Sequence, residues 1–433
     1  MLPLHAGALT PQEPVVNPPS EPEAGRQAEL DRLATQVLGE VSRLRGLEVR
    51  TPIRARYADK DAFLQYVHAM DEQLMGQGRQ AKDEWVARLL QCIPWDMDLV
   101  AVQEKVLADQ VGGFYDPFSK TFYVMEGLSP DLVRLIMAHE LAHALDDQHF
   151  DLKAADLARR DRTDWLYAHH AICEGSAQVT MTQWMAANQA SIDPASLMEF
   201  VKRSDPASLS GVPRLVWQPL FALYLGGQAF LGRSDRLNPA GTYDRADLQR
   251  AFEHLPLSTE QILHPAKYWD EAQLDLPQEV EHVIQALPAG WQVEHTDVLG
   301  ELLVHLVPQS LLQAKMNAFS LMGMRFTGDA AAGWDGDRVT LLRNGDQRVL
   351  VWDLVWDGDG DGAEFARAFS KRERPEGPVT DELSTTGPRQ SRLLAFAGTG
   401  REVAREVAAA VEVRVTPSAK MPGPALAAPD GGR

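Results

Sequence analysis

Two histidines and a glutamate occupy one short run, Met137-Ala-His139-Glu140-Leu-Ala-His143, which has the form H-E-x-x-H. Residues four apart on a helix share one face, so both imidazoles can reach a single metal ion. Glu140 lies about 100° around the helix from His139, beside the place where a metal-bound water would sit. There it can act as a general base. These residue types at this spacing predict zinc-dependent hydrolysis.

The residues around the motif predict the helix that holds it. Ser129-Pro130-Asp131 supplies a hydroxyl for the N-cap, a proline at the first helical position and an acid in the first turn. The helix should continue to about Gln148. Leu132 and Ile136 lie on the same helical face as the two histidines, which indicates that the imidazoles point into the protein.

A catalytic zinc ion normally has three protein ligands, and two residues compete for the third position. His149 lies six residues after the second histidine, but Asp146 stands where the metzincin pattern H-E-x-x-H-x-x-G-x-x-H needs a turn glycine. Glu174 lies on the next predicted helix, residues 163 to about 188, among small and apolar neighbours. An unpaired carboxylate in such a setting is costly. We therefore prefer Glu174 and keep His149 as the alternative.

Further polar residues are candidates for supporting roles. Asp147 follows His143 by four residues and Asp146 by three, so either can orient that imidazole, although a solvated helix end explains them equally well. An electrophile is needed to stabilise the developing oxyanion. His264, Tyr268 and His170 are the candidates for it.

Two hairpins are predicted. Residues 111–115 and 121–124 are rich in aromatic and β-branched types, and residues 116–119 supply the turn between them. Asn344-Gly345 separates two further apolar runs and is a strong short-range hairpin signal. The first hairpin directly precedes the helix of the H-E-x-x-H motif.

The chain has 433 residues, more than one hydrophobic core usually organises. Helical spacing dominates its first part, while strands gather after about residue 338. We expect an α+β protein with a mostly helical catalytic domain that carries a small hairpin or sheet, then a helical segment and a small α/β domain. The expected divisions are a disordered leader over 1–25, the catalytic domain over 26–205, the helical extension over 206–325, the α/β domain over 326–415 and a disordered tail over 416–433.

Composition narrows the classes of partner. The net charge is −19, which disfavours nucleic acid and anionic membrane surfaces. Two cysteines exclude a disulfide framework and a cysteine-rich zinc site. The sequence has no run of about 18 apolar residues, so we expect no transmembrane helix. The expected partner is a peptide or protein substrate, and the sequence leaves the oligomeric state open.

The N-terminus leaves localisation open. Residues 1–10 lack a basic region and a long apolar core, so they are not a complete signal peptide. Residues 11–25 are rich in proline and glutamate, as in the leader that follows a cleaved signal or lipid anchor. We expect export or surface display if a signal lies upstream of Met1, and a cytoplasmic location otherwise.

Several runs together resemble a family of little-studied bacterial and archaeal surface-associated proteins. Their motif is similar to that of the gluzincin clan, whose best-known member is thermolysin. The resemblance covers most of residues 50–400. The runs are Gly113-Phe-Tyr-Asp-Pro117, Cys173-Glu-Gly175, and residues 138–151, 258–268, 330–337 and 356–365.

The resemblance implies a zincin-like metallopeptidase domain. It implies zinc binding by His139, His143 and Glu174, with Glu140 as the base. Gluzincins hold an extended substrate against a strand near the zinc helix, and the hairpin at 112–124 would supply that strand. Glu174 lies further from the second histidine than the corresponding glutamate of thermolysin does.

An acidic run, Asp357-Gly-Asp359-Gly-Asp361-Gly362, imitates the start of a calcium-binding EF-hand loop. The twelfth position, which needs a bidentate glutamate, is Ala368, and Glu364 comes too early. We therefore prefer a helix-capping acidic turn to a Ca²⁺ site.

The residues and the resemblance together predict a zinc-dependent hydrolase, a gluzincin-type metallopeptidase that cleaves peptide bonds with a zinc-activated water. Two other classes remain open. One is a non-catalytic surface or binding protein that keeps a zincin fold, and the other is a zinc amidase or esterase for a non-peptide substrate.

Overall fold

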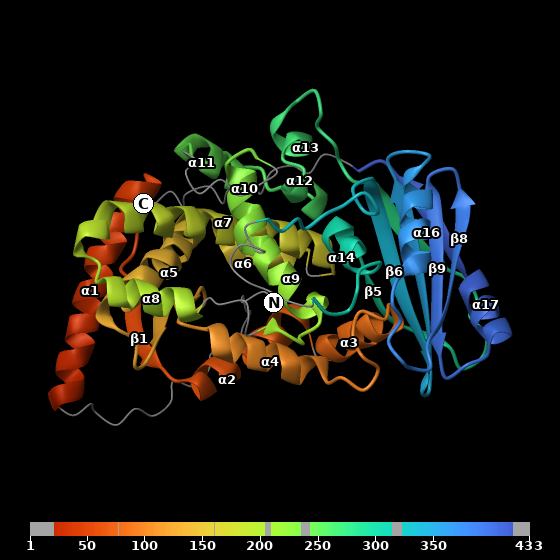
Figure 1. Cartoon of the computed structure of the whole chain (residues 1–433), viewed down its shortest axis with the longest axis horizontal. Coiled ribbons are helices and arrows are strands. Elements are labelled where there is room, and N and C mark those ends of the chain that lie inside the picture. Colours follow the sequence, from red (N-terminus) through yellow and green to blue (C-terminus); the bar gives the residue numbers. More distant parts are fainter. Residues whose placement is uncertain are drawn as a thin grey trace, which may run out of the picture.

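The computed structural model describes residues 21–76, 78–159, 161–203, 209–234, 243–313 and 323–418. Within them the protein is α+β, as expected, with helices in the N-terminal part and most strands in the C-terminal part (Figure 1). Most of the expected leader and tail lie outside the described residues. Residues 21–25 of that leader are the first turns of a helix.

Three helices form the frame of the N-terminal part: α1 (Glu21–Arg45), α5 (Pro130–Phe150) and α7 (Thr163–Asn188). They share one hydrophobic core, in which α5 contributes mainly leucines and alanines. Alanines let neighbouring helices approach closely. The packing of α5 against α7 decides which of their side chains face each other.

A three-stranded sheet lies beside α5. Its order is β1-β3-β2, with β1 (Arg54–Ala58) parallel and β2 (Gly113–Asp116) antiparallel to the central β3 (Thr121–Met125). The hairpin of β2 and β3 confirms the prediction, and β2 is an edge strand.

The other helical segments of the N-terminal and middle parts are α2 (Lys60–Met75), α3 (Arg79–Leu89), α4 (Leu99–Gln110), α6 (Leu152–Ala158), η1 (Gln189–Ser191), α8 (Pro194–Arg203), α9 (Arg214–Phe221), η3 (Ala222–Gly226), α10 (Gly227–Leu231), α11 (Arg245–Glu253), α12 (Thr259–Leu263), α13 (Ala266–Trp269) and α14 (Gly300–Leu306).

Two glycines allow the helix that ends in α10 to cross α7 at backbone contact. A Cβ atom on Gly227 would lie 1.9 Å from the carbonyl oxygen of Ala171, and one on Gly175 would lie 2.5 Å from the carbonyl carbon of Gly227. No side chain fits at either position. The segment just before this crossing, η3, is a turn of π-helix, a feature that often marks functional sites.

The C-terminal part is a five-stranded antiparallel sheet of order β5-β6-β7-β9-β8. Both faces are covered: α16 packs with α3 and α14 on one face, and α17 packs with a two-stranded ribbon of β4 and β10 on the other. The elements are β4 (Glu279–Ile284), β5 (Gln292–Asp297), β6 (Trp334–Asn344), β7 (Gln347–Trp356), α16 (Asp361–Lys371), β8 (Thr380–Gly387), β9 (Gln390–Ala397), α17 (Arg401–Ala409) and β10 (Val411–Thr416).

The sequence pattern and the structure differ in a few elements. The hairpin at Asn344-Gly345 is confirmed, but β4 and β5 lie in the stretch 206–325 that we expected to be helical. Both strands find partners far along the chain, and a local pattern does not reveal such pairing. Ser129 is the N-cap of α5 as predicted, but its hydroxyl makes no capping hydrogen bond.

Among the described residues, no helix combines the length and the apolar character that crossing a bilayer requires. The described thiols of Cys92 and Cys173 are both free.

A buried aspartate joins α7 to the middle part of the chain. Asp164, only 3% exposed, accepts hydrogen bonds from the backbone nitrogen (2.8 Å) and the hydroxyl (2.5 Å) of Thr259. Burial raises the pKa of Asp164 to about 7, although the bonds from Thr259 lower it. The folded protein therefore keeps a proton that the unfolded chain releases near pH 4.

We expect Asp164→Asn to stabilise the protein at pH 8 by about 2–4 kcal/mol and to change little near pH 4. The folded pKa lies above the unfolded one, so the stability of the wild type falls as pH rises from about 4 to 7. The amide cannot ionise and escapes this loss. Thermal unfolding midpoints of both proteins at several pH values measure the effect. An equal difference at every pH would contradict it, and the exposed Asp109→Asn is the control.

Candidate metal centre

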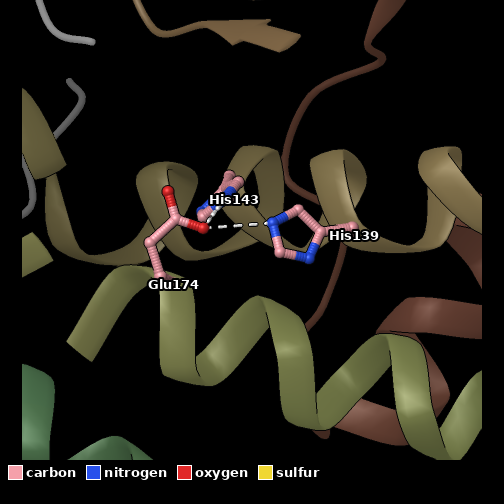
Figure 2. A group of neighbouring side chains, drawn as sticks. All are labelled: His139, His143 and Glu174. Atoms are coloured by element: carbon pink, nitrogen blue, oxygen red, sulfur yellow. Dashed lines mark hydrogen bonds and ion pairs between the residues drawn. The ribbon is translucent and has the colours of Figure 1, made fainter. Parts of the chain in front are cut away.

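Helices α5 and α7 bring three ligand-type side chains to one point. His139 and His143 project from α5 and Glu174 from α7, as Figure 2 shows. The Oε2 atom of Glu174 lies 3.2 Å from Nε2 of His139 and 3.5 Å from Nε2 of His143. The three ligand atoms lie within 4.8 Å of one another. The structure thus brings together the two histidines and the preferred third candidate.

The two distances from the Glu174 oxygen to the imidazole nitrogens suit a zinc ion. Zinc–ligand bonds of about 2.0–2.2 Å at tetrahedral angles place neighbouring ligand atoms about 3.3–3.6 Å apart. Two imidazole nitrogens and one carboxylate oxygen are also a donor set that zinc accepts in catalytic sites. The residues present therefore suit the ion, and three ligands leave a fourth position open.

The electrostatics of the cluster favour a cation. Burial raises the pKa of Glu174, but His143 and His139 outweigh it and hold that pKa well below its usual range. Burial lowers the pKa of His143, while Glu174 and Glu140 raise it, to about 9 overall. The carboxylate and the imidazole thus stabilise each other's charged forms, and a carboxylate kept ionised between two imidazoles favours a cation at this point.

Glu140 is fixed by the edge strand of the small sheet. Its Oε2 atom accepts a hydrogen bond of 3.0 Å from the backbone nitrogen of Tyr115 in β2. Burial raises the pKa of Glu140 above its ordinary value, although the nearby histidines of the cluster lower it. The N–H group of Tyr115 thus holds the Glu140 carboxylate beside the two imidazoles.

Tyr224 is a site residue that the sequence analysis missed. Its ring lies 5.8 Å from the His139 ring with an interplanar angle of 22°. Burial, then the charges of Glu174 and Glu140, raise the pKa of its phenol, which therefore lies within electrostatic reach of the Glu174 carboxylate. In the sequence Tyr224 stands in an apolar run, typical of a core aromatic. Only the glycine crossing and the π-helical turn place it over the cluster.

The two aspartates after the motif hold the surrounding helices. Asp146 is fully buried and accepts from Arg45 of α1 at 2.6 Å and from Ser176 of α7 at 2.6 Å. Asp147 accepts from the Tyr115 hydroxyl at 2.8 Å and from Lys120. Asp146 thus ties α5 to both neighbouring helices. Asp147 ties it to the β2–β3 hairpin rather than to His143.

The remaining candidates lie with other partners. His149 bonds to the carbonyl oxygen of Glu48 at 2.8 Å. His170 lies 3.0 Å from a carboxylate oxygen of Asp156. The other two belong to the middle part: His264 lies 2.9 Å from Glu301, and the Tyr268 hydroxyl donates to the carbonyl oxygen of His254 at 2.6 Å.

The acids of the EF-hand-like run have protein partners of their own. Asp357 lies 2.6 Å from the Lys267 ammonium group and Asp359 lies 2.8 Å from Arg389. Asp361 accepts from the backbone nitrogen of Gly358 at 2.7 Å, just before α16. These acids lie in a turn that leads into α16, as expected, but the N-cap residue is Gly360 and no side chain caps the helix.

Comparisons with known proteins reach only part of the chain. A family described as a domain of unknown function (DUF8575) matches residues 289–414, which is most of the C-terminal part and less than half of the chain. No curated protein matches. One solved structure is similar, that of a Chloroflexus aurantiacus protein provisionally named a hydrolase with a novel fold. It has 18% sequence identity and a TM-score of 0.35, and the match covers 57% of this chain and 90% of that one. So distant a likeness assigns neither a fold nor an activity to this chain.

Proposed function

We propose that this protein is a zinc-dependent hydrolase of the metallopeptidase type. The observation that carries the proposal is that Glu174 Oε2 lies 3.2 Å from His139 Nε2 and 3.5 Å from His143 Nε2, close to the separation of two ligand atoms around a tetrahedral zinc ion. Glu140 lies on the same helix, next to the first ligand, as a base requires.

Bound zinc would polarise the scissile carbonyl and acidify a water molecule. Glu140 would take the proton of that water and later return it to the leaving amine. The Tyr115 N–H group holds one oxygen of Glu140, which leaves the other oxygen for the proton. A carboxylate with a raised pKa suits both transfers, because it accepts a proton more readily and still releases it.

The edge of β2 supports a peptide as the substrate. The carbonyl of Gly112 accepts from Met125 of β3, so the backbone groups of Gly113 and Tyr115 face the other way. Tyr115 uses its N–H on Glu140, and the neighbouring Gly113 is only partly buried. An extended chain can pair with this edge beside the base.

Cleavage assays with matched substrates test the proposal. We expect the zinc-loaded protein to cleave members of a peptide library, to lose this activity with a chelator and to regain it with zinc. One equivalent of bound zinc without any turnover would instead indicate a binding protein. Turnover confined to small esters or non-peptide amides would instead indicate a zinc amidase or esterase.

The contact between Tyr224 and Glu174 gives a further prediction. We expect Tyr224→Phe to weaken zinc binding by about tenfold, because partners that orient a ligand carboxylate typically contribute ten- to hundredfold to metal affinity. Competition with a chromophoric chelator measures the dissociation constant. Tyr268→Phe, which loses a hydroxyl that bonds to the carbonyl oxygen of His254 in another place, is the matched control. Equal zinc affinity in both variants and the wild type would contradict the positioning role.

A further inference from the structure

A cavity separate from the zinc cluster lies where the helical part meets the C-terminal sheet. Side chains of α3, α4, α7 and α14 line most of it, and its interior volume is about 110 Å³. An apolar cavity of roughly 150 Å³ is enough to bind a molecule such as benzene, so a cavity of this order accepts a small organic molecule. None of the four proposed zinc-site residues lines it, so the cavity has no role in the mechanism above.

Most of the cavity wall is apolar. Leucine and valine side chains of all four helices line it, among them Val86, Leu99, Leu166 and Leu303. Such a wall favours an aliphatic or aromatic body, because burying that body removes apolar surface from water.

One end of the cavity is polar and keeps hydrogen-bonding capacity unused. The Oδ1 atom of Asp83 accepts a hydrogen bond of 2.6 Å from Arg79, while no described residue bonds to its Oδ2 atom. The Asp83 side chain is 35% exposed. The hydroxyl of Tyr167, which also lines the cavity, has no hydrogen-bond partner among the described residues either. Asp297, by contrast, is saturated: it accepts from Arg79, from the backbone and hydroxyl of Thr163 and from Val298 N–H.

Carboxylates outnumber guanidinium groups among the described residues at this end of the cavity. Asp83 and Asp297 surround the single guanidinium of Arg79, and His295 Nε2 lies 3.6 Å from Asp83. Among the described residues of this group, two carboxylates share one guanidinium. The free acceptor atom of the group belongs to Asp83, at the cavity.

We propose that this cavity binds a small organic ammonium ion with an apolar body. The ammonium group lies against Asp83 Oδ2 and the Tyr167 hydroxyl, and the body packs on the leucine and valine wall. The proposal depends on the cavity alone and holds whether or not the protein hydrolyses peptides.

Three probes with one skeleton test the charge. Isothermal titration at pH 7 compares cyclohexylmethylammonium, cyclohexylmethanol and cyclohexanecarboxylate on the full chain. We expect one equivalent of the amine to bind, at least about tenfold more tightly than the alcohol, because a hydrogen bond to a charged group is stronger than a neutral one. The carboxylate should not bind. Equal affinity for amine and alcohol would overturn the charge assignment, and no binding of any probe at millimolar concentration would overturn the site.

Two variants locate the ligand. Asp83→Asn should reduce the preference for the amine over the alcohol about tenfold, and Leu303→Phe should weaken both by filling the apolar end. Asp109→Asn on α4 is the control, because its exposed carboxylate pairs with Lys60 away from the cavity. Unchanged affinity in Leu303→Phe, with normal circular dichroism, would contradict the site. If Asp83→Asn does not fold, the comparison of the three probes on the wild type decides.

Discussion

Glu140→Gln is expected to lower kcat/KM for peptide cleavage by about a thousandfold while zinc stays bound. General acid–base catalysis typically raises the rate by a factor of about 100 to 10,000, and the amide cannot take the proton of the attacking water. The amide oxygen can still accept from the Tyr115 N–H, so the helix and the edge strand should keep their positions. Steady-state kinetics and metal content by mass spectrometry measure the two effects separately.

The control for this variant is Glu402→Gln, an exposed glutamate in the first turn of α17. It should match the wild type in both measurements. A Glu140→Gln protein that retains zinc and more than about a tenth of the activity would remove Glu140 from the role of base. A protein that loses zinc as well would show that the residue acts on the metal site.

Glu174→Ala is expected to weaken zinc binding by about a thousandfold or more. The change removes a ligand itself, so its effect should exceed the ten- to hundredfold typical of residues that only orient ligands. It also removes the carboxylate that both imidazoles contact. Zinc dissociation constants from chelator competition measure the loss.

His149→Ala is the matched variant, because His149 was the other candidate for the third ligand. His149 lies in the last turn of α5, and its ring bonds to the carbonyl oxygen of Glu48. We therefore expect its loss to leave zinc affinity within about threefold of the wild type. The reverse outcome, with zinc lost in His149→Ala and kept in Glu174→Ala, would exchange the two residues.

The local parts of the site were predictable from the sequence. A helix with two histidines on its buried face is a short-range pattern, and α5 occupies the expected residues. The position of Glu174 followed from a carboxylate among small apolar neighbours on a second predicted helix. Both inferences needed only helical periodicity and the cost of burying charge.

The non-local parts were not predictable. Tyr224 reaches the cluster only because two glycines let a second helix cross α7 at backbone contact. Asp146 stood out as the residue in place of a turn glycine, yet its partner Arg45 lies 101 residues away. The strand β8 has a polar sequence because it is the edge of its sheet, and a local pattern reads such a stretch as a linker.

The central claim is that two histidines of α5 and one glutamate of α7 hold a zinc ion. Anomalous diffraction at the zinc absorption edge, from crystals grown with one equivalent of zinc, tests it most directly. We predict one strong peak about 2.0–2.2 Å from His139 Nε2, His143 Nε2 and a carboxylate oxygen of Glu174. A strong peak elsewhere, for instance at the buried group of Asp156, His169 and His170, with none between α5 and α7, would contradict the account.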